Sequence, residues 1–229
     1  MRIYLIRHPK PEVAPDICYG SSDLTVSGQE QAAVLAALLP QLHALPLNTP
    51  IFSSPLLRCA TLARQLALAR GDSAPAPQFD ARLAEMDFGS WEMRAWETIA
   101  RGDIDAWAAN LTGYRPGGGE SVLQVAARVH AFYADLARTP FECAIVICHA
   151  GTIRLSLAAQ STRSFEDIAC AAAGTPHKIA YGALCILDLP AVLVANQGST
   201  SCNAHLSISC ENVHPVPLND RQSHPRQTA

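Results

Sequence analysis

The sequence predicts an α/β fold, a three-layer sandwich in which a mostly parallel central sheet is flanked by helices. Short apolar runs of strand character alternate along the chain with stretches whose apolar residues recur at helical spacing. Such alternation favours a parallel sheet with helices on both faces. The chain has 229 residues, 49% of them hydrophobic and 16% charged, which is enough to bury one large core.

Strands are expected at residues 2–6, 50–54, 78–83, 143–148 and 178–187. The clearest is the fourth, which reads Cys-Ala-Ile-Val-Ile-Cys and is typical of a strand buried on both faces. The first strand leads into Arg7 and His8. Pro9 and Pro11 then prevent further ladder pairing, so a loop is expected from residue 9 to residue 26.

Helices are expected near residues 27–39, 56–69, 94–110, 121–137 and 152–160. Ser27 and Glu30 have the spacing of a capping box at the start of the first helix, and Pro40 is expected to end it. Pro55 stands at the start of the second helix, where the missing N–H of proline has no cost. A glycine-rich segment, Gly117 to Ser121, separates the third and fourth helices.

Residues 1–190 are expected to form one domain, with an insert that carries helices at about 85–137. Residues 191–229 have a different composition, rich in Ser, Asn, His and Pro and with little periodicity. This tail is expected to be loosely ordered, although residues 192–195 could add an edge strand. The sequence does not fix the oligomeric state, and a homodimer is one option.

Charge and hydropathy exclude several classes of partner. The formal net charge of −3 provides no basic field for a nucleic-acid backbone. The N-terminal apolar run is too short for a signal peptide, and no run reaches the roughly 20 residues of a membrane span. A cytosolic protein is therefore expected, in which most of the eight cysteines are reduced and pack in the core.

Polar side chains follow the strands at the edge where ligands bind in open parallel sheets. Arg7 and His8 end the first strand, and His149 follows the fourth. Arg58 lies on the helix after the second strand, and Glu85 lies in the loop after the third. If the sheet is parallel, two arginines, two histidines and one glutamate converge on one end of it.

This set of residue types suits phosphoryl transfer to a small-molecule phosphomonoester. Guanidinium groups can fork onto phosphate oxygens, and a neutral imidazole can attack phosphorus in line. A second imidazole can donate hydrogen bonds to the phosphate, and a carboxylic acid can protonate the leaving oxygen. The scheme needs neither a metal nor another cofactor, because cationic side chains compensate the phosphate charge.

Three alternatives remain open. Cys148 to Arg154 fits the pattern Cys-x-x-Gly-x-x-Arg, in which a thiolate attacks phosphorus from a backbone cradle. A metal hydrolase could use His8, His149 and Glu85, although no two candidate ligands have His-x-x-x-His spacing. A phosphate-binding module without activity would keep the cations but would need neither a nucleophile nor an acid.

Five motifs in order resemble those of the histidine phosphatase superfamily, which includes cofactor-dependent phosphoglycerate mutase. They are Arg7-His8, Ser53 to Ala63 (Ser-Ser-Pro-Leu-Leu-Arg-Cys-Ala-Thr-Leu-Ala), Glu85 before Phe88-Gly89-Ser90-Trp91-Glu92, Gly118-Gly119-Glu120-Ser121, and His149 to Arg154. The resemblance covers Arg2 to about Leu189. It implies a phosphoglycerate mutase-like fold and a metal-independent phosphomonoesterase.

The resemblance also implies a role for each site residue. His8 would be the phosphorylated nucleophile, and Glu85 the proton donor. Arg7, Arg58 and His149 would form the phosphate pocket, with His149 counted among the catalytic residues as well.

Within the superfamily the chain is most similar to the alpha-ribazole phosphatases of cobalamin biosynthesis. The likeness lies in Cys18-Tyr19-Gly20 before Asp23-Leu24, in Glu85 to Arg94, and in Trp107 followed by Pro116 to Ser121. It implies that alpha-ribazole 5′-phosphate or cobalamin 5′-phosphate is the substrate. The mutases usually carry an Asn in the loop after the first His, and residues 9–27 contain none, which favours a phosphatase. A broad-specificity sugar or nucleotide phosphatase and a mutase-like enzyme are the alternatives within the superfamily.

Pro9 departs from the Gly or Thr that is usual after the nucleophile in this superfamily. Proline has no N–H, and it pushes the preceding residue toward an extended backbone. A hydrogen-bond donor to the phosphate pocket is therefore expected to be missing at this position.

Overall fold

The computed structural model describes residues 1–159, 164–174 and 179–189. Within them five strands form one sheet in the order β3-β2-β4-β1-β5. The strands are β1 (Arg2–Arg7), β2 (Ile51–Ser53), β3 (Gln78–Phe79), β4 (Cys143–Cys148) and β5 (Leu184–Asp188). All neighbouring pairs are parallel except β1 and β5, which are antiparallel. The predicted mostly parallel sheet is confirmed.

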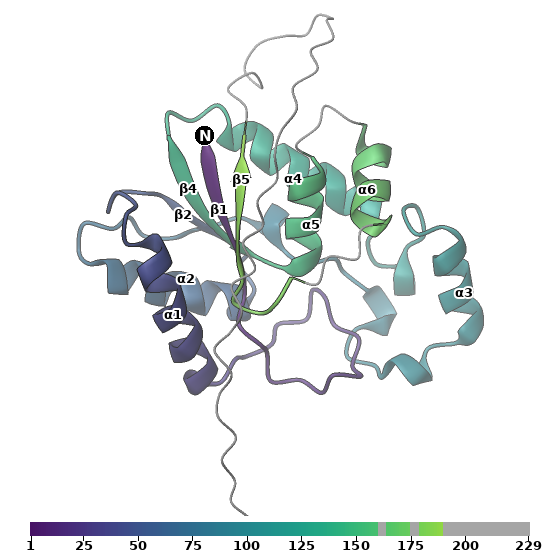
Figure 1. The fold of residues 1–229 in the computed structure, drawn as a ribbon. Coiled ribbons are helices and arrows are strands. Elements are labelled where there is room, and N and C mark those ends of the chain that lie inside the picture. Colours follow the sequence, from purple (N-terminus) through teal and green to yellow (C-terminus); the bar gives the residue numbers. More distant parts are fainter. Residues whose placement is uncertain (160–163, 175–178, 190–229) are drawn as a thin grey trace, which may run out of the picture.

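Helices cover both faces of this sheet, which gives the three predicted layers (Figure 1). The α-helices are α1 (Gly28–Leu42), α2 (Leu57–Arg70), α3 (Arg101–Ala109), α4 (Val122–Leu136), α5 (Ala150–Ala158) and α6 (Phe165–Gly174). Short 3₁₀ turns are η1 (Ala81–Leu83), η2 (Gly89–Trp91), η3 (Trp96–Thr98) and η4 (Pro116–Gly118).

The alternation of side chains along the strands divides the core into two halves. Ile3 and Leu5 of β1 pack with the apolar faces of α4, α5 and α6, whereas Ile6 packs with α1 and α2. Strand β4 alternates in the same way, with Val146 toward the first set of helices and Ile147 toward the second. All of these strand residues are fully buried, so the sheet holds the positions of its carboxyl ends rigidly.

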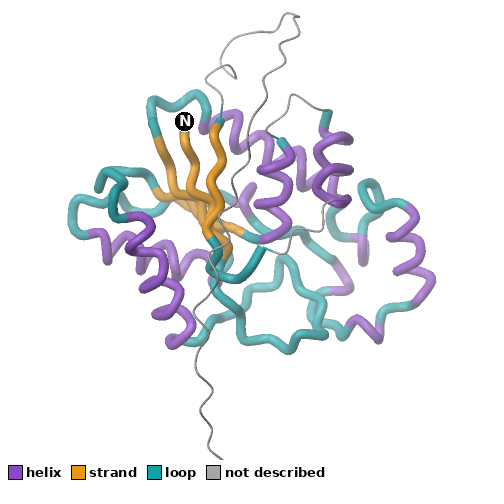
Figure 2. Tube along the Cα trace, in the orientation of Figure 1, coloured by secondary structure: helices purple, strands orange, loops and turns teal. Residues whose placement is uncertain are grey.

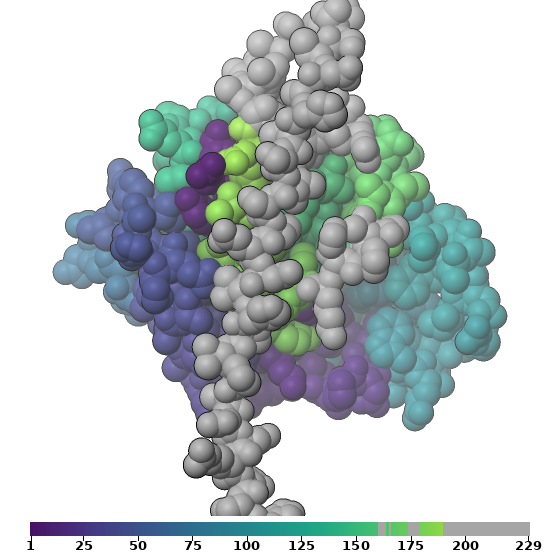
Figure 3. All heavy atoms as spheres, in the orientation of Figure 1, coloured from purple at the N-terminus to yellow at the C-terminus, as the bar shows by residue number. Residues whose placement is uncertain are grey.

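The segment between β3 and β4 contributes a lobe beside the sheet, seen in teal in Figure 3 next to the purple loop that follows β1. The two segments are joined by a bridge between Ile17 and Ala95. The Cys18 N–H also donates to the Arg94 carbonyl at 2.8 Å, and the Met93 N–H donates to the Cys18 carbonyl at 2.8 Å. These bonds hold the loop after β1 against the insert, at the carboxyl end of the sheet.

Two predicted element boundaries in the first part of the chain were wrong. Pro40 does not end the first helix, because Leu38 and Leu42 on either side of it are buried and hold the last turn in place. The third strand ends at Phe79 instead of residue 83. There the Asp80 carboxylate accepts the Arg82 N–H at 2.8 Å and starts a 3₁₀ turn.

In the second half two further predictions differ from the structure, and one helix is additional. The expected helix at 94–110 is split into η3 and α3, because Ile99 between them is extended and buried against Cys18 and Trp91. Helix α6 was not predicted. The last strand begins at Leu184 instead of residue 178, after a turn at Tyr181 and Gly182.

The expectations for the tail at 191–229, including the edge strand at 192–195, lie outside the described residues. In the part of the chain that the structure describes, no helix is both long and apolar enough to cross a membrane.

Candidate active site

Loops gather at the carboxyl ends of the parallel strands (Figure 2), and two adjacent strands bring two imidazoles together there. Strands β1 and β4 pair with Arg7 opposite Cys148, so the next residue on each strand is a histidine. The His8 N–H donates to the Cys148 carbonyl at 3.1 Å. The ring centroids of His8 and His149 lie 5.0 Å apart. The predicted convergence of these two side chains is therefore observed.

The hydrogen bonding of His8 fixes which ring nitrogen is free. Its Nδ1 lies 2.7 Å from the carbonyl oxygen of Pro9. A carbonyl oxygen only accepts, so we assign the ring proton to Nδ1, which leaves the lone pair on Nε2. Burial lowers the pKa of His8 to about 3, and the positive charges of Arg58 and Arg7 act in the same direction. His8 is thus a neutral imidazole at pH 7, the form that can act as a nucleophile.

Pro9, which differs from the residue usual in the family that the sequence resembles, has a part in this arrangement. It lacks an N–H, as expected, but its carbonyl is the group that accepts the His8 Nδ1 proton at 2.7 Å. The proline at this position therefore lacks one donor but supplies the contact that orients the His8 ring.

Arg58 is fully buried on the first turn of α2, and the loop after β1 holds its guanidinium. Nη1 donates to the Ser22 carbonyl at 2.7 Å, and Nη2 donates to the Gly20 carbonyl at 2.5 Å. The buried Nε of Arg58 has no hydrogen-bond partner among the described residues. A buried charged donor is costly without a partner, so this atom indicates where an anion would bind.

Arg7 is held from the other side of the pocket by the segment that precedes β5. Its Nη1 donates to the Ile179 carbonyl at 2.5 Å, and its guanidinium carbon lies 3.8 Å from the centre of the Tyr181 ring. The Tyr181 hydroxyl in turn shares a hydrogen bond of 2.9 Å with the Tyr19 hydroxyl. The Arg7 Nε, like that of Arg58, is buried and finds no partner within the described part of the chain.

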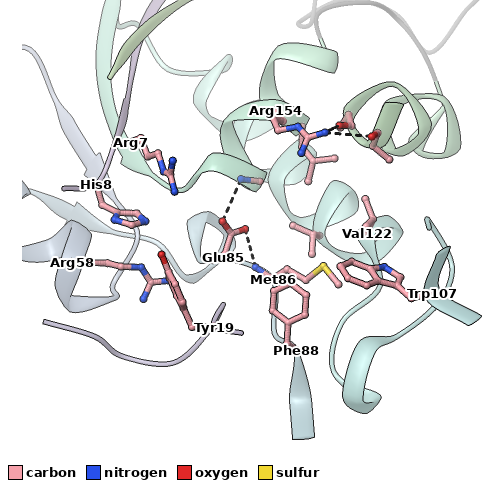
Figure 4. Close-up of a pocket in the computed structure, with 15 residues that line it drawn as sticks. Arg7, His8, Tyr19, Arg58, Glu85, Met86, Phe88, Trp107, Val122 and Arg154 are labelled. Atoms are coloured by element: carbon pink, nitrogen blue, oxygen red, sulfur yellow. Dashed lines mark hydrogen bonds between the residues drawn. The ribbon is translucent and has the colours of Figure 1, made fainter. Parts of the chain in front are cut away.

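Glu85 faces the two arginines and His8 across the pocket (Figure 4). Its Oε2 accepts the Gly151 N–H at 3.3 Å at the start of α5, and its Oε1 accepts the Met86 N–H at 3.1 Å. These bonds fix the carboxylate in the part of the pocket that Arg7, His8 and Arg58 also line, where a carboxyl group can exchange a proton with a bound ligand.

The backbone around Glu85 is braced by a partly buried ion pair. Arg128 on α4 binds the Glu120 carboxylate through Nε at 2.8 Å and Nη2 at 2.9 Å. The same guanidinium donates to the carbonyls of Ala84 at 2.7 Å and Glu85 at 3.2 Å. The Glu120 motif seen in the sequence therefore supports the loop that carries Glu85 instead of contacting the pocket.

His149 lies behind His8 and is not among the residues that line the pocket. Its Nε2 is 2.8 Å from the Ser54 hydroxyl oxygen and 3.5 Å from the Cys59 sulfur. Burial lowers the pKa of His149 well below its ordinary value, and His8 and Arg58 add to the effect. The ring is therefore neutral. In this geometry it packs against the His8 ring, and it does not line the cavity.

The pocket has a volume of about 330 Å³, within the range of small-ligand sites. One end is polar, and the rest of the lining is apolar apart from Arg154. The polar end is lined by Arg7, His8, Tyr19, Arg58 and Glu85, and the rest by Met86, Phe88, Trp107, Val122, Val125, Gly151, Arg154, Leu155, Ala172 and Ala173. Four of the five predicted site residues, Arg7, His8, Arg58 and Glu85, therefore line one cavity (Figure 4).

The sequence did not reveal the aromatic and apolar wall of the pocket. Trp107 is held there by edge contacts with Phe88 and Trp91, at centroid distances of 5.9 and 5.8 Å, and by stacking on Trp96 at 6.3 Å. From the sequence alone, aromatic residues in an insert are expected to pack in a core. The tertiary structure places this cluster beside the sheet, so that Trp107 and Phe88 line the pocket.

The cysteine alternative finds no accessible nucleophile. Cys148 is fully buried in β4 within the apolar core, and burial raises the pKa of its thiol well above the ordinary value. Arg154 does line the pocket, but its Nη2 donates to the carbonyls of Ala172 and Ala173 on α6. Among the side chains in the described ranges, no group of three or more His, Cys, Asp or Glu is placed to hold a metal ion.

Comparisons with known proteins point to one family. The profile of the histidine phosphatase superfamily (branch 1) matches residues 3–179. The adenosylcobalamin/alpha-ribazole phosphatase of Escherichia coli (strain K12) is 31% identical over 168 residues, which are 69% of this chain and 78% of that protein.

Solved structures agree. A mycobacterial glucosyl-3-phosphoglycerate phosphatase in complex with VO3 superposes with a TM-score of 0.67 at 25% identity, over 82% of this chain and 92% of that one. The alpha-ribazole phosphatase from Shigella flexneri superposes with a TM-score of 0.66 at 25% identity, over 82% and 90% of the two chains. The profile match extends over most of the chain and includes all the residues gathered in the pocket. The chain therefore belongs to the histidine phosphatase superfamily, whose members are phosphatases or mutases.

Proposed function

We propose that the protein is a metal-independent phosphomonoesterase that forms a phosphohistidine at His8. The observation that carries this proposal is the neutral His8 ring, with its lone pair on Nε2, beside two arginines whose buried Nε atoms find no partner among the described residues. Two guanidinium groups match the charge of a phosphate dianion, and the imidazole supplies the nucleophile.

In the first step, His8 Nε2 attacks phosphorus in line, an N–P bond forms, and the bond between phosphorus and the leaving oxygen breaks. Glu85 gives a proton to that oxygen as the alcohol departs. In the second step, water attacks phosphorus, Glu85 takes one proton from the water, and the N–P bond breaks to release inorganic phosphate. Arg7 and Arg58 hold the phosphate oxygens throughout, and His149 supports the His8 ring from behind.

The substrate that we favour is alpha-ribazole 5′-phosphate, with cobalamin 5′-phosphate as the larger relative. The apolar half of the pocket supports this choice, because Met86, Phe88 and Trp107 offer apolar contacts to the aromatic base that the departing ribose alcohol carries. A nucleoside-sized ester suits a pocket of about 330 Å³, whereas a corrin ring would have to remain outside it. The named phosphatase at 31% identity acts on this class of molecule. We expect the reaction to take place in the cytosol.

The test is a comparison of kcat/KM across phosphomonoesters at one pH. The panel contains alpha-ribazole 5′-phosphate, 3-phosphoglycerate, glucosyl-3-phosphoglycerate, fructose phosphates and mononucleotides. We expect alpha-ribazole 5′-phosphate to have the highest value. A tenfold or greater preference for a sugar phosphate or a phosphoglycerate would overturn the proposed substrate but leave the phosphatase chemistry intact. Equal values for all of the esters would indicate a broad-specificity enzyme.

A further inference from the structure

We infer that Glu92 is a positioning residue that orients the Arg58 guanidinium for phosphate, although Glu92 does not line the pocket. This inference rests on the proposed function, since it takes Arg58 as a phosphate ligand. Hydrogen bonds connect three groups: the Glu92 carboxylate binds the turn at residues 20–22, and the same turn binds the Arg58 guanidinium.

The Glu92 carboxylate collects the N–H groups of that turn. Its Oε1 accepts the Ser21 N–H at 2.9 Å, and its Oε2 accepts the N–H groups of Gly20 at 3.0 Å and Ser22 at 3.1 Å. The hydroxyls of Ser21 and Ser22 also donate to it, and Oε1 accepts the Phe88 N–H at 2.9 Å. One carboxylate thus joins the loop after β1 to the segment that carries Glu85.

The opposite side of the same turn holds Arg58. The carbonyls of Gly20 and Ser22 accept the two Nη groups, which leaves only Nε without a partner in the described structure. The peptide group between Gly20 and Ser21 is shared, because its carbonyl binds Arg58 and its N–H binds Glu92. In such a chain each hydrogen bond polarises the next, so the carboxylate charge strengthens the hold on the guanidinium.

The turn has little freedom to find another position. A Cβ atom at Gly20 would lie 1.9 Å from the Met86 carbonyl oxygen, so the two backbones touch. Burial alone would raise the pKa of Glu92, but the hydrogen bonds from Ser22, Phe88, Gly20 and Ser21 outweigh it, and the net pKa is lowered. The carboxylate is therefore ionised at neutral pH, as the chain of hydrogen bonds requires.

Glu92→Gln tests the link, because it keeps the size of the side chain but places an NH₂ against N–H groups that need an acceptor. The measurement is the inhibition constant of inorganic phosphate for wild type, E92Q, Arg58→Ala and the double variant. We expect each single variant to weaken phosphate binding by about tenfold to a hundredfold, the range for partners of charged groups. The double variant should bind phosphate no worse than Arg58→Ala alone, because the two residues act through one contact.

Asp80→Asn is the matched control. Asp80 is also a half-buried carboxylate that accepts a backbone N–H and binds an arginine, Arg82, but neither residue lines the pocket. It should lower the melting temperature and leave the phosphate inhibition constant within about twofold of wild type, since it loses an ion pair but no pocket contact. If it weakens phosphate binding as E92Q does, the effect of E92Q is one of stability, and the inference is wrong.

The remaining outcomes separate the inference from the proposed function. If Arg58→Ala leaves phosphate inhibition unchanged, the proposed phosphate site is wrong and the role of Glu92 goes with it. If Arg58→Ala weakens binding but E92Q does not, or if the two effects multiply in the double variant, the site stands and the positioning role is overturned. If E92Q does not fold, Glu92→Asp replaces it in the same cycle, since it keeps the charge but shortens the reach by one methylene.

Discussion

Gly151 and Glu85 are in such close contact that no side chain would fit between them. A Cβ atom built on Gly151 would lie 2.5 Å from Oε1 of Glu85, closer than real Cβ contacts allow. The same glycine donates its N–H to Oε2 of Glu85 at 3.3 Å. Gly151 therefore sets the position of Glu85, the proposed acid. A glycine is needed here because of this close approach and not because of its backbone conformation, since Gly151 lies in helix α5.

Gly151→Ala should displace the Glu85 carboxylate, because the end of a flexible side chain moves more readily than the helix. We expect kcat to fall by about a hundredfold, the size typical of a 1 Å misplacement of a catalytic group. The melting temperature should change little. Gly28→Ala serves as control, since a Cβ there meets nothing within 4 Å. Wild-type kcat in Gly151→Ala would show that the position of Glu85 does not matter.

Glu85→Gln should slow esters with poor leaving groups far more than aryl esters. An alkoxide needs a proton as it departs, whereas a nitrophenolate does not, so the loss should be about 10²- to 10⁴-fold for the alkyl ester only. The measurement is kcat/KM for an alkyl phosphate and for p-nitrophenyl phosphate. Equal slowing of both would exclude Glu85 as the general acid.

His8→Ala should abolish turnover and the formation of a phosphoenzyme. In wild type, quenching without acid should trap a phosphoryl group that is labile in acid and stable in base, as expected of a phosphohistidine. Cys148→Ser is the control and should retain phosphorylation, because that thiol is fully buried. The cysteine mechanism would be favoured instead if Cys148→Ser lost activity and His8→Ala kept it.

The free energy of unfolding should fall as the pH drops below about 6.5, the ordinary pKa of histidine. Burial lowers the pKa of folded His8 to about 3. Between these two values the unfolded chain binds a proton that the folded protein excludes, so the stabilisation is complete above the upper value and lost toward the lower one. His149, whose pKa is also lowered, acts in the same direction.

One such histidine can change the free energy of unfolding by at most ~1.4 kcal/mol per pH unit. Urea unfolding of wild type and His8→Asn between pH 7.5 and pH 5 measures this change. The variant should show a shallower decline in the free energy of unfolding. Identical slopes for both proteins would mean that His8 is not held neutral in the folded state.

Local patterns in the sequence were sufficient to predict most of the helices and strands and to single out the polar residues that line the pocket. The apolar run at 143–148 was predicted correctly as a strand, and the first strand was predicted to within one residue of its end at Arg7, because strand character depends on neighbours in the chain. The prediction that Pro40 ends the first helix was wrong, because the end of that helix depends on residues that are not its neighbours in the chain. The helix continues because Leu38 and Leu42 are buried, and burial is decided by tertiary packing.

The sequence by itself determined that the chain is an α/β protein, and it singled out Arg7, His8, Arg58 and Glu85, which line one pocket. Only the tertiary structure decided that His149 lies behind His8, that Trp107 forms the apolar wall, and that Arg7 is held by a carbonyl 172 residues further along. The physical reason is that β1 pairs with β4 in one register, and contacts between such distant segments leave no periodic trace in the sequence.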